Sequence, residues 1–193
     1  MSHLLYGLVR GICWVILKGV FRAEVEGAHL LVKEGPVLLC ANHIAWWDPP
    51  LISVASHRKV SFMAKEALFG NRLVGRLLKL LGAFPVRRHV PDRAAIQHAL
   101  GLLEHGQVVG MFPEGTRSRS GELQKGLHGA ALLALRSGAW VVPAGIVGAY
   151  RPGGRPRIRF GRPFRLEEAG RRSEALDRGS QRIMEEIAGL LKP

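Results

Sequence analysis

The residues whose types and spacing are best suited to catalysis lie in a polar loop, residues 42–50, which directly follows the apolar run 36–41. His43 is followed five positions later by Asp48, and the chain contains only three aspartates. A carboxylate that accepts the Nδ1 proton of an imidazole fixes its tautomer and leaves Nε2 free to remove a proton from a hydroxyl group. The spacing therefore predicts a general base oriented by an acid. The structural alternative is a histidine that closes the loop and an aspartate that caps the following helix.

A second polar loop, residues 113–124, follows the apolar run 107–112. In this loop Glu114 offers a hydrogen-bond acceptor and Arg117 a bidentate donor, while Gly115 lets the backbone approach a ligand closely. Such a loop could hold a hydroxyl and a phosphate group together. The structural alternative is a polar turn with a local ion pair between Glu114 and Arg117.

The charge of the chain indicates an anionic partner. The 193 residues carry 28 Lys and Arg against 15 Asp and Glu, a net charge of +13, and residues 35–165 hold the whole excess. A domain body this basic attracts nucleic acid, an anionic membrane surface or a phosphorylated substrate. Arg87 and Arg88 follow the short apolar run 83–86 and would favour an anion near the two loops. Their structural alternative is a solvated strand end.

The elements that must position these loops alternate between strands and helices. Strand-like runs occupy residues 21–26, 36–41, 59–64, 83–86, 107–112, 139–147 and 157–160, and helical periodicity occupies residues 51–56, 71–81, 92–105, 127–137 and 173–191. This order predicts an α/β fold with a mostly parallel central sheet flanked by helices. In such sheets the functional loops leave the carboxyl ends of the strands, which is where both polar loops begin. The length favours one domain, residues 23–193, preceded by an N-terminal segment, residues 1–22.

The N-terminal segment is predicted to be an amphipathic helix in the membrane interface. Its apolar residues fall on one side of a helical projection, and Arg10 and Lys18 fall on the other. Trp14 suits the same interface. The two basic residues interrupt the run, which argues against a helix that spans the bilayer. The third possibility is a helix packed on the core of the domain.

The cysteines predict neither a disulfide scaffold nor a metal centre. Cys13 and Cys40 are the only two, and no His or Cys cluster with metal-ligand spacing surrounds them. The chain also lacks a Gly-x-Ser-x-Gly elbow, and neither cysteine lies in a polar loop. Covalent catalysis by a serine or cysteine nucleophile and a structural zinc site are therefore not expected.

Taken together, the motifs resemble those of the glycerolipid acyltransferases, and most closely those of bacterial 1-acyl-glycerol-3-phosphate acyltransferases. The resemblance rests on Asn42-His43 with Asp48, on the block 82–88, on the string Phe-Pro-Glu-Gly-Thr-Arg-Ser at 112–118, and on Val-Val-Pro at 141–143. It covers about residues 20–165. The chain departs from the family pattern at Ala45, where a serine is common, and at Arg87, where an acidic residue is common.

The resemblance implies a role for each matching residue. His43 would be the general base and Asp48 would orient it, while Glu114, Gly115, Thr116 and Arg117 would bind the glycerol phosphate acceptor and Arg88 would help to hold its phosphate. Residues 71–81 would help to wall the channel for the acyl chain. No metal or other cofactor is implied beyond the acyl thioester, of acyl carrier protein or of coenzyme A, which serves as co-substrate.

The implied activity is transfer of an acyl group to the sn-2 hydroxyl of lysophosphatidic acid, giving phosphatidic acid in phospholipid synthesis. The implied location is the cytoplasmic face of the cell membrane, where the enzyme would be peripheral or monotopic. An acyltransferase for another acceptor, such as a lyso-ornithine lipid, is the alternative. A module that binds membrane or nucleic acid by charge alone gives no reason for the His43–Asp48 pair. Nucleic acid is not an expected partner, because aromatic residues, 7% of the chain, offer few stacking platforms.

Overall fold

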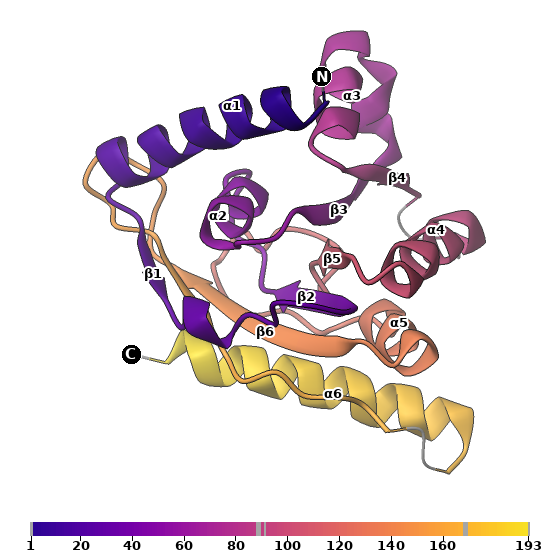
Figure 1. Cartoon of the computed structure of the whole chain (residues 1–193). Helices are drawn as coiled ribbons and strands as arrows, with labels where there is room; N and C mark the ends of the chain where they lie inside the picture. The colour runs from indigo at the N-terminus through magenta and orange to yellow at the C-terminus, as the bar shows by residue number, and fades with distance from the viewer. Residues whose placement is uncertain (1, 88–89, 91, 168–169, 193) are drawn as a thin grey trace.

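A single mixed sheet forms the centre of the molecule. The computed structural model describes residues 2–87, 90, 92–167 and 170–192, and within them seven strands pair in the order β1-β7-β6-β2-β5-β3-β4 (Figure 1). The strands are Glu24–Glu26 (β1), Val37–Ala41 (β2), Val60–Lys65 (β3), Phe84–Val86 (β4), Val108–Met111 (β5), Trp140–Val147 (β6) and Arg157–Phe160 (β7). Neighbouring strands run parallel except β6 and β7, which are antiparallel. The predicted α/β fold with a mostly parallel sheet is confirmed.

Helices cover both faces of this sheet. They are Ser2–Val15 (α1), Asp48–Ala55 (α2), Arg72–Leu80 (α3), Arg93–Glu104 (α4), Gly129–Ser137 (α5) and Arg172–Leu191 (α6). A π-helical turn, Ile16–Val20, extends α1, and neither this turn nor the short 3₁₀ helix Glu66–Gly70 was expected from the sequence. The helix predicted from residue 51 begins three residues earlier, because Pro49 and Pro50 occupy its first turn, where proline is favourable. The strand predicted at 21–26 is confined to its last three residues.

The alternating apolar residues of the strands divide the core into two clusters. Leu39, Ala41 and their neighbours pack under α2 and the end of the N-terminal helical segment. Leu38 and Cys40 point the other way and pack against α4, α5 and α6. Because successive side chains of a strand face opposite sides of the sheet, β2 contributes to both clusters. All five of its residues are buried, as expected for a central strand of a parallel sheet.

The pairing of β2 places the two polar loops side by side. β2 lies between β5 and β6, and Cys40 pairs with Met111 of β5 and with Pro143 of β6. The loop after Ala41 and the loop after Met111 therefore leave the same edge of the sheet, at the carboxyl ends of two adjacent parallel strands. This is the position at which open α/β sheets bind their ligands.

The helix α1 turns its apolar side outward. Leu4, Leu8, Ile12, Trp14 and Val15 are each at least half exposed. The opposite side faces α2: Nη2 of Arg10 donates hydrogen bonds to the carbonyl oxygens of Val54 and Ser56 at the end of that helix. A guanidinium group is favourable there, because the last carbonyls of a helix lack intrahelical partners and carry its negative dipole end. The described part of the chain contains no helix with the length and apolar character needed to cross a membrane.

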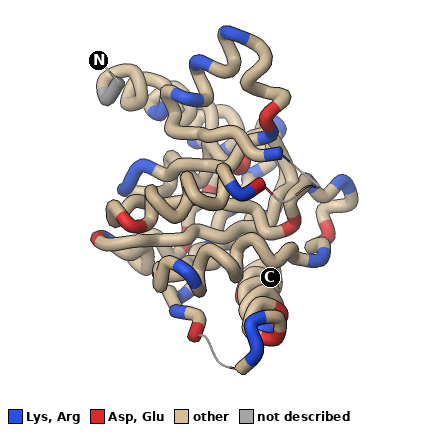
Figure 2. Tube along the Cα trace, turned by 90° about the vertical axis from the view of Figure 1, so that its right-hand side faces the viewer, with Lys and Arg blue, Asp and Glu red and all other residues tan. Residues whose placement is uncertain are grey.

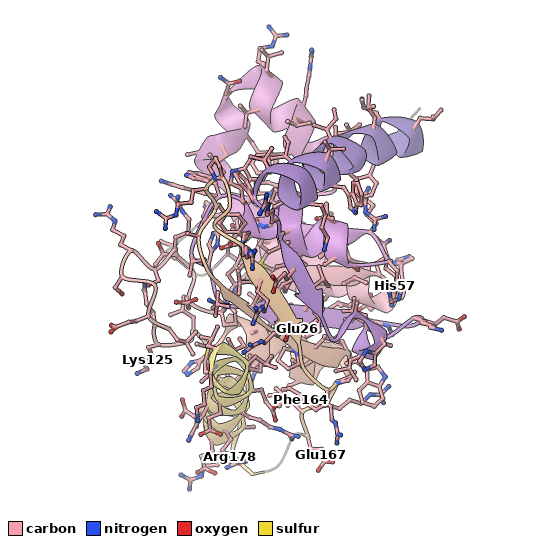
Figure 3. All side chains as sticks on the ribbon, turned by 90° about the vertical axis from the view of Figure 1, so that its left-hand side faces the viewer. Glu26, His57, Lys125, Phe164, Glu167 and Arg178 are labelled. Atoms are coloured by element: carbon pink, nitrogen blue, oxygen red, sulfur yellow. The ribbon has the colours of Figure 1, made fainter. Side chains whose placement is uncertain are left out.

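An ion-pair ladder fastens the first strand to the sheet edge. Arg157 of β7 pairs with Glu24 of β1 at 2.7 Å, and Arg159 pairs with Glu26 at 2.9 Å. Glu26 is labelled in Figure 3, in the view that has β1 in front of the sheet. The chain that follows α1 is thereby held against β7. Other basic positions are distributed over several outer helices and loops (Figure 2).

Candidate active site

The predicted contact between His43 and Asp48 is present. Nδ1 of His43 lies 2.7 Å from Oδ2 of Asp48, and the two side chains are 9% and 0% exposed. The imidazole ring stacks on Phe112, with ring centroids 3.9 Å apart and an interplanar angle of 15°. Among the described residues, no hydrogen-bond partner occupies Nε2 of His43. With the Nδ1 proton donated to Asp48, Nε2 is left as the basic atom of the pair.

The carboxylate of Asp48 is held by donors on both oxygens. Oδ2 also accepts the backbone N–H groups of Ile44 at 2.7 Å and of Ala45 at 2.8 Å. Oδ1 accepts the hydroxyl of Tyr150 at 2.7 Å. Asp48 therefore closes the loop that precedes α2, and it does not cap that helix with its side chain. A buried carboxylate with four donors is satisfied and fixed in orientation.

Asn42 anchors the start of this loop to β6. Its side-chain amide donates to the carbonyl oxygen of Ile146 at 2.8 Å, and its carbonyl oxygen accepts the N–H of Ile146 at 2.6 Å. The two bonds continue the β2–β6 ladder by one residue beyond Ala41. Asn42 thus sets the point from which His43 departs, a role that its place in the motif did not reveal.

Glu114 ties the two loops together. Oε1 accepts the backbone N–H of His43 at 2.8 Å, and Oε2 accepts the N–H of Gln124 at 2.9 Å. The N–H of Ser118 completes the junction by donating to the carbonyl oxygen of His43 at 2.8 Å. Burial raises the pKa of Glu114 above its ordinary value, and the two backbone donors oppose that shift. Both carboxylate oxygens accept hydrogen bonds within the protein, so the side chain predicted to contact the acceptor also joins the two loops.

One cavity of about 790 Å³ brings most of the predicted site residues together. His43, Glu114, Gly115 and Thr116 all line it. Its remaining wall is largely apolar and comes from β3, β4, β5, α4, α5, α6 and the loop before α5. It includes Val86, Ile96, Met111, Leu127, Leu132 and Leu176. Gly115 has a φ of +70°, and a Cβ there would lie 2.7 Å from Leu127, so this position requires glycine.

Arg117, which was predicted to bind the acceptor, differs from this arrangement. Arg117 is not among the lining residues, and its guanidinium lies over the ring of Trp46, 4.0 Å from the ring centroid. Trp46 is 62% exposed, so the pair forms part of the surface beside the loops. Arg88 lies outside the described residues. Its neighbour Arg87 lines the cavity and pairs with Asp92 at 3.6 Å.

The wall of this cavity does not include α3. The resemblance implied that residues 71–81 help to wall the acyl channel, but α3 contributes no lining residue to this cavity. Leu73 of α3 is instead 78% exposed. Across the described residues, no group of three or more His, Cys, Asp or Glu side chains is arranged to hold a metal ion.

Comparison with known proteins agrees with this geometry. The model of the Acyltransferase family matches residues 22–147, which include both loops. A 1-acyl-sn-glycerol-3-phosphate acyltransferase of Streptococcus pneumoniae is 32% identical over 161 residues, covering 79% of this chain and 60% of that protein. A protein of the same name from Bacillus subtilis is 36% identical over 121 residues, covering 62% of this chain and 59% of that protein. The chain thus spans about 60% of the length of these curated relatives.

A solved structure shares the fold. The crystal structure of the 1-acyl-sn-glycerophosphate (LPA) acyltransferase PlsC from Thermotoga maritima superposes with a TM-score of 0.78, at 21% sequence identity. The match covers 100% of this chain and 82% of that one. The superposition shows that the two proteins share a fold, and the family model matches both polar loops of this chain. The chain belongs to the Acyltransferase family.

Proposed function

We propose that this protein transfers an acyl group from an acyl thioester to the sn-2 hydroxyl of 1-acyl-glycerol-3-phosphate, giving phosphatidic acid. The observation that carries the proposal is the His43–Asp48 pair, whose histidine lines the same largely apolar cavity as Glu114, Gly115 and Thr116. The cavity suits a hydrocarbon chain, and its basic surroundings suit a phosphate group. The names of the two bacterial relatives support the same acceptor.

The proposed reaction is a direct transfer. Nε2 of His43 accepts the proton of the acceptor hydroxyl while its oxygen attacks the thioester carbonyl carbon. A C–O bond forms, the C–S bond breaks, and the leaving thiolate takes the proton from His43. Asp48 stabilises the imidazolium that exists between these two proton transfers. Because a thioester is already activated, the chemistry calls for no metal ion.

An acyl-transfer assay tests the proposal. Purified protein is given lysophosphatidic acid with acyl-coenzyme A or acyl carrier protein thioester, and we expect phosphatidic acid with at least one of these donors. Lyso-ornithine lipid is offered in parallel as the competing acceptor. Turnover of the ornithine lipid with none of lysophosphatidic acid would replace the acceptor assignment and keep the acyltransferase chemistry.

Arg117 is proposed to bind the acceptor's phosphate from the rim of the site. The guanidinium lies over the ring of Trp46, beside the loops of the site, and its planar fork suits bidentate contact with a phosphate group. For Arg117→Lys we expect the KM for lysophosphatidic acid to rise about tenfold, since one charge-assisted hydrogen bond is lost. Initial-rate kinetics measure this effect. Arg119→Lys, at an exposed position two residues away, is the matched control, and an unchanged KM in Arg117→Lys would remove Arg117 from the phosphate site.

We further propose that the protein docks on the cytoplasmic face of the membrane through α1 and α3. These helices lie side by side at one end of the molecule (Figure 1). Their outward residues form an apolar surface, consisting of Leu4, Leu5, Leu8, Ile12, Trp14, Val15, Leu73, Val74 and Leu77. Three exposed basic residues of α3, Arg72, Arg76 and Lys79, flank it and would meet anionic headgroups. Such an apolar surface bordered by cations fits an interfacial position.

Placing a charge on this surface should weaken membrane binding. For Leu8→Glu we expect at least a tenfold loss of affinity for vesicles that contain anionic lipid, because a leucine contributes about 1.5–3 kcal/mol when it is fully buried in an apolar environment. Vesicle co-sedimentation measures the affinity. Ser173→Glu adds the same charge at an exposed position of α6, on the opposite side of the molecule, and should have little effect. Equal affinities of Leu8→Glu and Ser173→Glu would refute the docking surface.

A further inference from the structure

Tyr150 touches the acid of the catalytic pair but not the cavity. Its hydroxyl donates to Oδ1 of Asp48 at 2.7 Å, across 102 residues of sequence. The other oxygen, Oδ2, accepts the three bonds from the histidine loop, including Nδ1 of His43. Among the described residues, Tyr150 is the sole donor to Oδ1. The rotation of the Asp48 carboxylate about its Cβ–Cγ bond is therefore fixed from two sides.

The loop that carries Tyr150 is itself anchored. The ring of Tyr150 packs edge to face against the ring of Phe21, with centroids 6.0 Å apart and an interplanar angle of 78°. Further along the same loop, the N–H of Gly153 donates to the carbonyl oxygen of Val20 at 3.2 Å, and the N–H of Arg155 donates to that of Phe21 at 3.0 Å. An aromatic contact and two backbone bonds thus hold the hydroxyl in place before any substrate binds.

We propose that Tyr150 is a positioning residue for the His43–Asp48 pair, which it serves by holding Oδ2 of Asp48 directed at Nδ1 of His43. This inference rests on the proposed acyl transfer. Without the hydroxyl, Oδ1 would be a buried acceptor lacking its donor, and the carboxylate could turn away from the imidazole. Burial, followed by the charge of Asp48, raises the pKa of Tyr150, so the hydroxyl remains a donor throughout the working pH range. Tyr150 does not exchange a proton with the substrate.

The two tyrosines of the chain provide a matched test. Tyr150→Phe deletes one hydroxyl and keeps the ring that contacts Phe21. Tyr6→Phe deletes the hydroxyl of a residue whose buried oxygen has no hydrogen-bond partner among the described residues. We expect kcat to fall about 10- to 100-fold in Tyr150→Phe, the effect of losing one hydrogen bond to a charged group, with the KM of each substrate changed less than twofold. Tyr6→Phe should keep the kcat of the parent protein.

A spectroscopic readout separates positioning from stability. The proton between His43 and Asp48 is followed by its low-field resonance in proton NMR. Because this hydrogen bond forms only in folded molecules, the resonance reports on them alone, and the measurement needs no substrate. The resonance should shift in Tyr150→Phe and stay in place in Tyr6→Phe. A parental kcat in Tyr150→Phe, or a lower kcat with an unmoved resonance, would overturn the inference. If the parent protein acylates no acceptor while the resonance still shifts, the proposed function fails and the positioning role stands.

Discussion

Replacing His43 by alanine is expected to lower the rate of acyl transfer by about 10²- to 10⁴-fold, the range that general-base catalysis contributes. The imidazole lines the cavity, and its partner Asp48 is buried and held by four donors. Alanine leaves no base to accept the hydroxyl proton. The KM for the acceptor should change little, because the phosphate contacts assigned to Arg117 remain.

The loss must be separated from unfolding. His43 packs on Phe112, so the variant removes an aromatic contact as well as a base. Circular dichroism and urea unfolding establish whether the protein is folded under assay conditions. His57→Ala is the control, because His57 is exposed and lies at the surface (Figure 3). Activity of folded His43→Ala within tenfold of the parent would contradict the proposed mechanism.

Replacing Asp48 by asparagine should lower kcat by at least about 10²-fold while changing stability far less than replacement by alanine. The amide oxygen can take the place of Oδ2 and accept the bonds of His43, Ile44 and Ala45. Its NH₂ group can then donate to the hydroxyl oxygen of Tyr150, which accepts as well as donates. The geometry survives, but the negative charge that stabilises the imidazolium is gone.

The opposite orientation of the amide in Asp48→Asn would also lower the rate. If the NH₂ group faces His43, the proton moves from Nδ1 to Nε2, and the base is lost. Asp48→Ala leaves several buried donors without an acceptor, at a cost of about 1–3 kcal/mol for each. Steady-state kinetics together with urea unfolding distinguish the two variants, and Glu122→Gln controls for loss of an exposed carboxylate. Parental kcat in a folded Asp48→Asn protein would show that the charge of Asp48 does not assist the reaction.

Much of the architecture could be predicted from local patterns. The apolar run that became β2 and the run that became β5 are short, continuous and followed by polar loops, which is typical of buried parallel strands. Their shared edge of the sheet then brings His43 and Glu114 together. The His43–Asp48 contact was also predictable, because a five-residue spacing lets one turn close on itself.

Other features depend on contacts that no local pattern encodes. Tyr150 reaches Asp48 because β6 lies next to β2, so its role required the strand order. The oxygens of Glu114 bind backbone N–H groups, and any residue type can supply such donors. Helical periodicity showed that α1 has two faces, but it could not tell which one meets the protein. The face that carries Arg10 meets the protein, because Arg10 donates hydrogen bonds to carbonyl oxygens at the C-terminal end of α2.

The attachment of the Tyr150 loop to Val20 and Phe21 connects the N-terminal segment to the residues that hold Asp48. Phe21 touches Trp47, the residue immediately before Asp48, as well as Tyr150. A displacement of Phe21 would therefore disturb two neighbours of the acid, Trp47 in the same loop and the hydrogen-bond donor Tyr150. A truncated protein that begins at Phe21 would lack the carbonyl oxygen of Val20, which accepts the N–H of Gly153 in the Tyr150 loop. The activity of such a protein would therefore differ from that of the longer chain.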